Sequence, residues 1–268
     1  VIHDVIVDAD VTSNVASSSY GTGGLIGKIS GLSNIRNCGV NGSIKNIATN
    51  TSSAAYTGGL IGYIAGNCTI NNSYASCSVE NENTASSSST GGLIGKTSNY
   101  YTLGVNNCYA SGNVSAKKGY AGGITGYVSC SSSYKHTYNN CYAAGQVAVT
   151  NAPANAYGFA YSYYSAGFSS TNCFYNKINP KGFNETVEGI TEKTSDELKE
   201  MDAALGGAFQ TDTTGINNGY PILSWQYTDP DATCSVTFNV IPKDSELTWN
   251  GEKQPINEDG TYTFENVK

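Results

Sequence analysis

A short glycine-rich phrase that returns at nearly constant spacing constrains the fold of this chain more than any other feature. Its first four copies begin 35, 33 and 31 residues apart, and a degenerate fifth copy begins 35 residues later. A fixed period in this range is typical of stacked units, none of which buries its apolar face alone. The copies are Gly23-Gly24-Leu25-Ile26-Gly27, Gly58-Gly59-Leu60-Ile61-Gly62, Gly91-Gly92-Leu93-Ile94-Gly95, Gly122-Gly123-Ile124-Thr125-Gly126 and Tyr157-Gly158-Phe159-Ala160-Tyr161.

A second phrase follows each glycine phrase and alternates small or apolar residues with polar ones. Alternation with period two is the signature of a β-strand, and the spacing of three and four that a helix needs is absent. The start of the chain fits the same phrase, so we predict six units, the first without its glycine half. The copies are residues 4–11, 37–44, 72–79, 107–114, 140–147 and 172–178.

Short strands repeated at a fixed period predict an all-β fold, a right-handed parallel β-helix (β-solenoid) of about six coils over residues 1–190. A β-propeller is the alternative, but its blades usually run longer. In a solenoid, equivalent residues form ladders along the axis, and asparagine suits a ladder at a turn because it tolerates strained backbone and its amide can bond the next copy. The expected ladders are an inward one of Val5, Cys38, Ser73, Cys108, Cys141 and Cys173, and a turn ladder of Asn37, Asn72, Asn107, Asn140 and Asn172.

The eight cysteines allow two interpretations. Adjacent strands lie close enough for disulfides in principle. However, four cysteines recur at one position of the repeat, and buried cysteine also packs as a small hydrophobe. We therefore expect free, packed thiols in this ladder. No CxxC motif exists and the only histidines are His3 and His136, which argues against zinc.

Composition narrows the function classes. The net charge is −7, only 13% of residues are charged, and Arg36 is the single arginine. A chain without a basic cluster is not expected to bind nucleic acid. No apolar run approaches the length of about 20 residues that spans a bilayer, so we expect no membrane insertion in this region. No signal peptide is visible, and we interpret the chain as a mature fragment of a longer protein.

The sequence after the repeats predicts a cap and a further module. Thr194 and Glu197 match a capping box, acidic residues crowd the first turn, and Gly206 supplies a stop. We predict one helix here that covers the open end of the solenoid, and a closing segment that packs onto the same end, within residues 191–228. Residues 233–268 alternate between turn signals and predict a small β-sandwich-like module, which either leans on the solenoid or is cut short.

The two repeated phrases together resemble the pattern of a known protein family. The phrases Gly-Gly-Leu-Ile-Gly and Asn107-Cys108-Tyr109-Ala110-Ser111-Gly112-Asn113-Val114 resemble the GLUG repeat of bacterial surface and secreted proteins. The resemblance covers about residues 1–228, and residues 233–268 are similar to a module repeated in large secreted bacterial proteins. It implies export, attachment elsewhere in the parent chain, and a role in adhesion or presentation. The family supplies no catalytic residues to carry over.

An aromatic ladder is the main candidate binding site. The residues directly after the inward ladder point outward by alternation and predict a stripe of rings that can bind a glycan or a protein. The alternative is that a loop or the C-terminal region covers the rings, or that they only stabilise neighbouring strands. The candidate ligand-binding residues are Tyr74, Tyr109, Tyr142 and Phe174.

Two further groups of residues carry charge. Lys28, Tyr63, Lys96 and Tyr127 follow the glycine phrase in successive units and predict cation–π stacking between coils, which we interpret as structural. Asp4, Asp8 and Asp10 share the first strand. They are weak candidates for calcium or for catalysis, and an acidic edge that deters aggregation is the favoured interpretation.

These observations predict a non-catalytic, extracellular or cell-surface bacterial region that mediates adhesion or presents a ligand, with a host or matrix glycan or protein as its partner. We expect a monomer without cofactors. The alternatives are a polysaccharide-active β-helix enzyme, which needs two carboxylates or an acid and a base in one groove, and a passive stalk.

Overall fold

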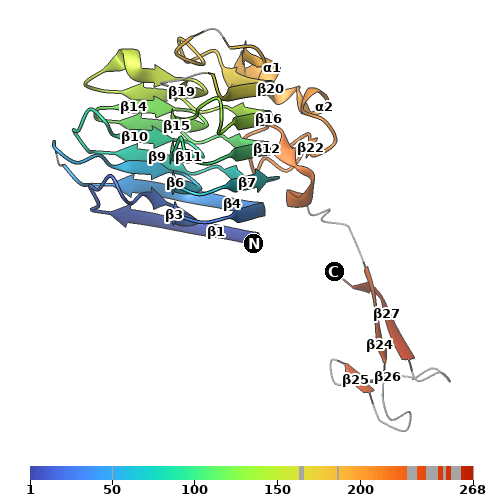
Figure 1. Cartoon of the computed structure of the whole chain (residues 1–268). Coiled ribbons are helices and arrows are strands. Elements are labelled where there is room, and N and C mark those ends of the chain that lie inside the picture. Colours follow the sequence, from blue (N-terminus) through green and yellow to red (C-terminus); the bar gives the residue numbers. More distant parts are fainter. Residues whose placement is uncertain are drawn as a thin grey trace. The chain divides into compact units, whose positions relative to one another are not determined.

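The computed structural model describes residues 1–49, 51–162, 166–185 and 187–227 in full. For the C-terminal region it describes the backbone of the strands β24 (Cys234–Asn239), β25 (Leu247–Trp249), β26 (Glu252–Gln254) and β27 (Thr261–Val267). The chain forms two compact units, residues 1–224 and 225–268 (Figure 1).

The first unit is a parallel β-solenoid of about five turns, as the period of the sequence predicts. Its described part is built from three parallel sheets. The Asn-Cys phrases and their flanks form the largest sheet, with the first strand at one end of the stack and the last at the other (Figure 1). Its strands are β1 (Ile2–Ser13), β4 (Ser33–Asn46), β7 (Cys68–Asn71), β8 (Tyr74–Ala75), β9 (Ser78–Asn81), β12 (Leu103–Ala110), β13 (Val114–Ala116), β16 (His136–Ala143), β17 (Val147–Val149), β20 (Phe168–Asn176) and β21 (Ile190–Lys193).

The glycine phrases form the other two sheets, because each phrase makes a tight turn between two short strands. One sheet precedes the turn and comprises β2 (Thr22–Gly23), β5 (Tyr56–Gly58), β10 (Ser89–Gly91), β14 (Tyr120–Gly122) and β18 (Ala156–Tyr157). The other follows the turn and comprises β3 (Ile26–Ile29), β6 (Ile61–Ile64), β11 (Ile94–Thr97), β15 (Thr125–Val128) and β19 (Ala160–Ser162). The structure thus has about five turns, with β1 at one end of the stack, where the sequence predicted about six coils.

The three glycines of one phrase each occupy a place where no side chain fits. A Cβ at Gly91 would lie 1.9 Å from the carbonyl oxygen of Ile94, inside the turn itself. A Cβ at Gly92 would lie 2.1 Å from the carbonyl oxygen of Gly123 in the next coil. A Cβ at Gly95 would lie 2.4 Å from the carbonyl oxygen of Gly62, where backbones pack directly on one another. The glycines are therefore required by close backbone approach, as their role in tight bends predicts.

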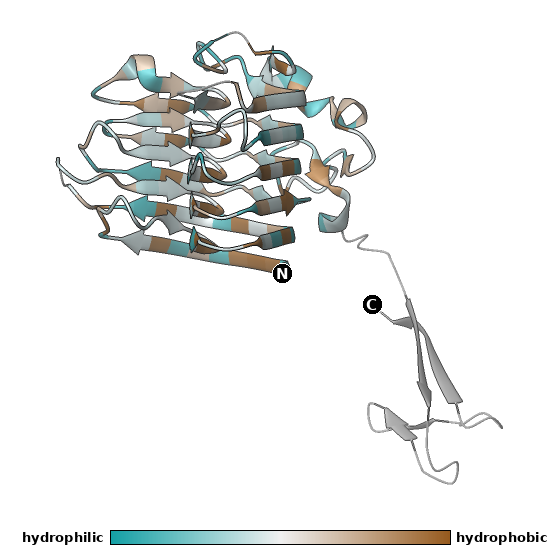
Figure 2. Ribbon diagram, viewed as in Figure 1, coloured by the Kyte–Doolittle hydropathy of each residue, from teal (hydrophilic) through white to brown (hydrophobic). Residues whose placement is uncertain are grey.

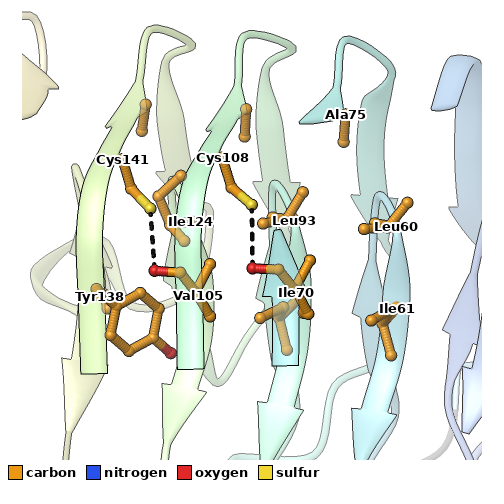
Figure 3. Packing of buried hydrophobic residues seen from close by; sticks show 14 of the residues in the cluster. Leu60, Ile61, Ile70, Ala75, Leu93, Val105, Cys108, Ile124, Tyr138 and Cys141 are labelled. Carbon is orange, nitrogen blue, oxygen red and sulfur yellow. Dashed lines mark hydrogen bonds between the residues drawn. The ribbon is translucent and has the colours of Figure 1, made fainter. Parts of the chain in front are cut away.

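The core lies between the sheets as ladders of equivalent residues. Leu60, Leu93 and Ile124 are fully buried, and the brown bands in Figure 2 recur at matching positions of successive strands. The thiols of Cys108 and Cys141 point into this core and approach the carbonyl oxygens of Ile70 and Val105, at 3.7 and 3.6 Å (Figure 3). The seven cysteines whose side chains are described are free and buried, which agrees with the expected packed thiols: Cys38, Cys68, Cys77, Cys108, Cys130, Cys141 and Cys173.

The asparagine ladder is present at the predicted turn, and every rung has left-handed backbone. Asn107 has φ 52°, and its Nδ2 donates to Asn72 Oδ1 at 2.9 Å, while Asn140 Nδ2 donates to Asn107 Oδ1 at 3.0 Å. The ladder begins one unit earlier than the sequence pattern indicated. Asp4 has φ 57° and its carboxylate accepts from Asn37 Nδ2 at 2.9 Å. A carboxylate suits this terminal rung, because the first residue of the series only has to accept.

The cap differs from the single helix predicted for residues 194–207. The capping box between Thr194 and Glu197 is present, but α1 (Ser195–Lys199) ends early and α2 (Asp202–Leu205) follows it. Leu198 and Leu205 are fully buried, and α1 contacts β20 and β21, the last strands of the large sheet. Among the described residues, no helix is long and apolar enough to cross a bilayer.

The closing segment leaves the end of the solenoid and runs along its side, where Phe209 lies near the rings of Tyr109 and Tyr142 in β12 and β16 (Figure 1). It contains β22 (Phe209–Gln210), β23 (Ile222–Leu223) and η2 (Ser224–Gln226), and β22 pairs antiparallel with β23. A separate 3-10 turn, η1 (Pro153–Asn155), precedes β18. The prediction that the closing segment packs onto the end of the stack is therefore wrong.

In the C-terminal unit, β24 pairs antiparallel with β27, and β25 pairs antiparallel with β26. Three of these strands agree with the alternating segments of the sequence. The turn signals in the sequence of this region, Asn250-Gly251 and Asp259-Gly260, lie outside the described residues.

Candidate functional site: a lysine–tyrosine ladder

The aromatic stripe expected from the Asn-Cys phrases exists as a stack but does not face solvent. The rings of Tyr74 and Tyr109 stack at 5.2 Å and 10°, and those of Tyr109 and Tyr142 at 5.1 Å and 8°. These three tyrosines are 4%, 0% and 0% exposed. Phe174 is in register with Tyr142 and is partly buried. The expectation of an exposed stripe is therefore wrong, and the alternative that another part of the chain covers the rings is correct.

The closing segment is what covers these rings. The Phe209 ring lies 6.5 Å from that of Tyr109 and 5.9 Å from that of Tyr142. Asn217 Nδ2 donates to the Tyr142 hydroxyl at 2.8 Å, and that hydroxyl donates to the carbonyl oxygen of Pro221. Burial is the main reason that the pKa of Tyr142 is raised. The stacked rings are thus an internal packing surface between the solenoid and its closing segment.

A single carboxylate holds the closing segment in shape. Asp212 Oδ1 accepts from the backbone N–H of Gly215 at 2.7 Å, and Oδ2 accepts from those of Asn217 and Gly219 at 2.8 and 3.0 Å. Burial opposes ionisation of Asp212, but these backbone hydrogen bonds outweigh it and lower its pKa. The loop that carries Asn217 to Tyr142 is therefore organised around a buried anion.

The acidic residues of the first strand do not gather into a site. Asp4 is engaged by His3 and by Asn37, whose hydrogen bonds lower its pKa, and Asp10 accepts from Ser43 Oγ at 2.6 Å. Asp8 is exposed beside Asn41 in the register. Within the described part of the chain, no three His, Cys, Asp or Glu side chains lie close enough together to hold a metal ion.

Two hollows at the C-terminal end of the solenoid lack the pair of carboxylates expected for hydrolysis of a sugar chain. The first is lined by Phe168 to Asn172 and by Val187, Glu188 and Gly189, with one carboxylate among them. The second contains Glu185 and Lys181. The Lys181 ammonium donates to the carbonyl oxygen of Ala154. Neither set of lining residues offers the carboxylate pair that most glycosidases use.

The stronger candidate is a column of lysines and tyrosines on the outer side of the glycine phrases. In the register of β3, β6, β11 and β15, Lys28 pairs with Tyr63, Tyr63 with Lys96, and Lys96 with Tyr127. Rings from the sheet before the turn and from the last coil flank this column. We call the whole set the lysine–tyrosine ladder, and its members are Tyr20, Lys28, Tyr56, Tyr63, Lys96, Tyr120, Tyr127, Tyr157, Tyr161 and Lys181.

Each lysine of the ladder lies over aromatic faces. The Lys28 ammonium is 5.5 Å from the Tyr20 ring centroid and 5.7 Å from that of Tyr63. The Lys96 ammonium is 4.3 Å from the Tyr56 ring centroid and donates to the Tyr56 hydroxyl at 2.9 Å. These distances are within the range of about 6 Å for cation–π attraction. Of the contacts that the sequence predicted, Lys28 over Tyr63 and Lys96 over Tyr127, at 5.3 Å, are confirmed.

The upper part of the ladder is a cluster of tyrosines. The rings of Tyr120 and Tyr161 stack at 4.0 Å and 18°, while Tyr127 and Tyr157 approach Tyr161 at 5.2 and 5.4 Å. The Lys181 ammonium lies 4.2 Å from the Tyr157 ring centroid and ends the series. Burial raises the pKa of Tyr161, and its hydrogen bond with Tyr120 adds to that effect. The Tyr161 phenol is therefore a neutral donor at physiological pH.

The ladder is partly open to solvent, unlike the stack beneath the closing segment. Tyr20 is 61% exposed, and Tyr63, Tyr127 and Tyr161 are partly buried. Burial lowers the pKa of Lys96 and of Lys181. The surface therefore combines accessible ring faces with cations held in a partly dry environment, an arrangement suited to binding rather than to bond cleavage.

Comparison with known proteins leaves the family of this chain open. No family model and no curated protein matches it. Among solved structures, the crystal structure of a Bacteroides ovatus protein described as a putative immunoglobulin A1 protease is similar, with a TM-score of 0.48 and 19% identity. The similarity covers 81% of this chain and 76% of that one. At this level no residue role passes from that protein to this chain, and the GLUG resemblance stays a prediction.

The sequence predicted the column after the glycine phrase, Lys28, Tyr63, Lys96 and Tyr127, but not the column of rings before it. The column after the glycine phrase recurs at a fixed position, so its alternation of lysine and tyrosine was visible. The rings before the phrase were the available signal, since Tyr56 and Tyr120 both stand two residues before their glycine pairs. That signal becomes interpretable only when the tight turn is known to bring the two columns together.

Proposed function

We propose that this chain is a non-catalytic glycan-binding region of a secreted or surface-displayed bacterial protein, and that the lysine–tyrosine ladder is its binding surface. The observation that carries the proposal is the row of partly exposed rings of Tyr63, Tyr127 and Tyr161, which lie on β6, β15 and β19 with Lys96 of β11 between the first two. Planar rings offer large contact area with little loss of side-chain entropy, and pyranose faces pack against them through their C–H groups. The bacterial surface location rests on the GLUG resemblance.

The regular geometry of the solenoid supports a polymeric ligand. Neighbouring coils lie about 4.8 Å apart, so the ladder repeats similar contacts along one straight line. A chain of sugar units can meet ring after ring in this direction, with weak individual contacts that add together.

A glycan array, followed by titration calorimetry on the strongest class of binder, tests this proposal. Tyr63→Ala with Tyr127→Ala removes two ring faces, and we expect affinity to fall at least tenfold, because each lost ring contact weakens binding by about 1 kcal/mol. Tyr100→Ala with Tyr134→Ala is the matched control, since these rings are 67% and 41% exposed and lie outside the ladder. Equal loss in both variants, or no binding by the wild type, would count against the ladder.

The array, a matrix-protein binding assay and product analysis together separate protein adhesion, enzymatic cleavage and a passive stalk. A wild-type protein that binds no glycan but is retained by a matrix protein favours protein adhesion. Release of shorter oligosaccharides on incubation with the bound glycan favours the enzyme, and absence of any ligand favours a passive stalk.

A further inference from the structure

The described lysines differ in what holds them. Outside the ladder, four lysines pair with glutamates: Lys45 with Glu80 at 2.9 Å, Lys117 with Glu82 at 2.8 Å, Lys177 with Glu192 at 3.2 Å and Lys193 with Glu197 at 3.7 Å. Lys118, Lys135 and Lys199 have no carboxylate within 4 Å among the described residues, and Lys199 lies over the Tyr220 ring. Lys28, Lys96 and Lys181 lie in the ladder instead, and within the described residues none of them has a carboxylate within 4 Å. The ladder therefore carries positive charge that the protein itself leaves uncompensated.

Aromatic faces and burial make these charges good anion sites. The Lys96 ammonium is fixed by the Tyr56 hydroxyl and lies between the faces of Tyr56 and Tyr127, at 4.3 and 5.3 Å from their centroids. Electrostatic attraction is stronger where water is partly excluded, so an incoming anion gains more here than at an exposed lysine.

The spacing of the three lysines sets the shape of the ligand. Lys28 and Lys96 are two coils apart with Tyr63 between them, which corresponds to about 10 Å along the axis. Lys181 follows Tyr157 at the far end, since its carbonyl oxygen accepts from Gly158 N in the coil below. A small anion can contact only one of these lysines. An extended polymer with repeated negative groups can contact all three, and the uncharged faces of its rings can then pack against Tyr63 and Tyr127.

We propose that the ligand of the lysine–tyrosine ladder is an acidic polysaccharide, bound lengthwise with its carboxylate or sulfate groups at Lys28, Lys96 and Lys181 and its sugar faces against the intervening tyrosines. This inference rests on the proposed glycan-binding function and narrows it to one charge class. A single-stranded nucleic acid also combines anions with stackable rings, but the chain has one arginine and no basic cluster of the kind that follows a phosphate backbone.

Biolayer interferometry with four immobilised polymers tests the inference: polygalacturonate for carboxylates, chondroitin sulfate for sulfates, dextran as a neutral glycan, and oligo-dT. We expect one of the two acidic glycans to bind most tightly and its affinity to fall as salt rises from 50 to 300 mM, because salt screens these contacts. Lys28→Gln, Lys96→Gln and Lys181→Gln together should weaken that binding at least tenfold. Lys117→Gln, Lys118→Gln and Lys135→Gln together change the net charge equally and should leave it unchanged.

The outcomes separate this inference from the function on which it rests. Equal binding to dextran, with no effect of the ladder lysines, overturns the acidic class and leaves glycan binding intact. Tighter binding to oligo-dT overturns the assignment to a polysaccharide. Equal loss of affinity in both triple-lysine variants would mean that net charge alone causes the effect, and would contradict the assignment of the site to the ladder. Absence of binding to all four polymers counts against the acidic class, and the glycan array then decides whether the general function stands. Circular dichroism of each variant confirms that the solenoid is folded.

Discussion

The hydroxyl of Tyr138 lies 3.0 Å from the hydroxyl of Thr125 in the fully buried core. Tyr138 stands in the ladder position that Ile70 and Val105 occupy in earlier coils, and Thr125 stands where Ile61 and Ile94 stand. The larger ring brings a polar atom into the interior, and the irregular threonine in the fourth glycine phrase provides its partner. The departure from the repeat is thus one coupled change in two strands.

This pairing predicts a strongly non-additive mutation series. Thr125→Val leaves the Tyr138 hydroxyl buried without a partner and should lower the free energy of unfolding by about 1–3 kcal/mol. Adding Tyr138→Phe should restore much of that loss, because both polar groups are then absent. Urea denaturation of the two single variants and the double variant measures the coupling, and purely additive effects would contradict the pairing.

The asparagine ladder predicts a difference between two adjacent asparagines. Asn107 has left-handed backbone, so Asn107→Ala should lose its amide contacts and add about 1–2 kcal/mol of backbone strain. Asn107→Gly relieves the strain and should be milder. Asn106 is the control, because its Nδ2 donates to Asn71 Oδ1 at 2.9 Å without positive φ. Thermal unfolding should rank Asn107→Ala as more damaging than Asn106→Ala, and equal losses would show that strain plays no part.

The repeats made the ladder architecture predictable, since one alternating strand fixes the pattern for every coil. The inward cysteines, the asparagine turn and the glycine bends all follow from positions that recur. What a repeat cannot supply is a contact made only once. Tyr109 was correctly placed on the outer side of its strand, but Phe209 covers it from a segment one hundred residues later. Alternation gives the direction of a side chain and says nothing about what packs over it.

Asp212 predicts how firmly that cover is held. Asp212→Asn replaces one accepting oxygen with a donor that faces backbone N–H groups. We therefore expect the free energy of local opening of the closing segment to fall by about 2–3 kcal/mol. Hydrogen exchange read by mass spectrometry should accelerate across residues 207–223 and across the Tyr142 strand. Asp202→Asn is the matched control, because the Asp202 carboxylate accepts from the Thr211 hydroxyl, at 2.9 Å, and not from the backbone N–H groups that Asp212 holds. Equal acceleration in both variants would mean that Asp212 has no special role.

Thiol chemistry should report the integrity of the core. Burial raises the pKa of Cys68 and Cys77 to about 12 and raises that of Cys141 as well, so thiolate is scarce in the folded protein. In a Cys234→Ser variant, which removes the one cysteine whose side chain lies outside the described residues, a disulfide reagent should find no reactive thiol at pH 8. All seven should react in denaturant. Rapid native reaction, or fewer than seven thiols after unfolding, would contradict a core of free cysteines.

His136 should make stability depend on pH in a defined window. It is 1% exposed, its Nε2 lies 3.0 Å from the carbonyl oxygen of Tyr101, and burial lowers its pKa from 6.5 to about 4. The unfolded chain therefore binds a proton more readily between these values. The stabilising contribution is fully present above pH 6.5 and is lost as the pH falls towards 4, by at most about 1.4 kcal/mol per pH unit.

His136→Gln removes this titration while keeping a side chain that can donate to Tyr101. Urea denaturation of both proteins at pH 7, 6, 5 and 4.5 measures the effect, and carboxylates and His3 contribute equally to each. We expect the variant to be less stable than the wild type at pH 7 because the pocket is imperfectly filled. The gap should narrow as the pH falls, since only the wild type loses stability through His136. Parallel curves would show that this imidazole does not titrate differently in the folded and unfolded states.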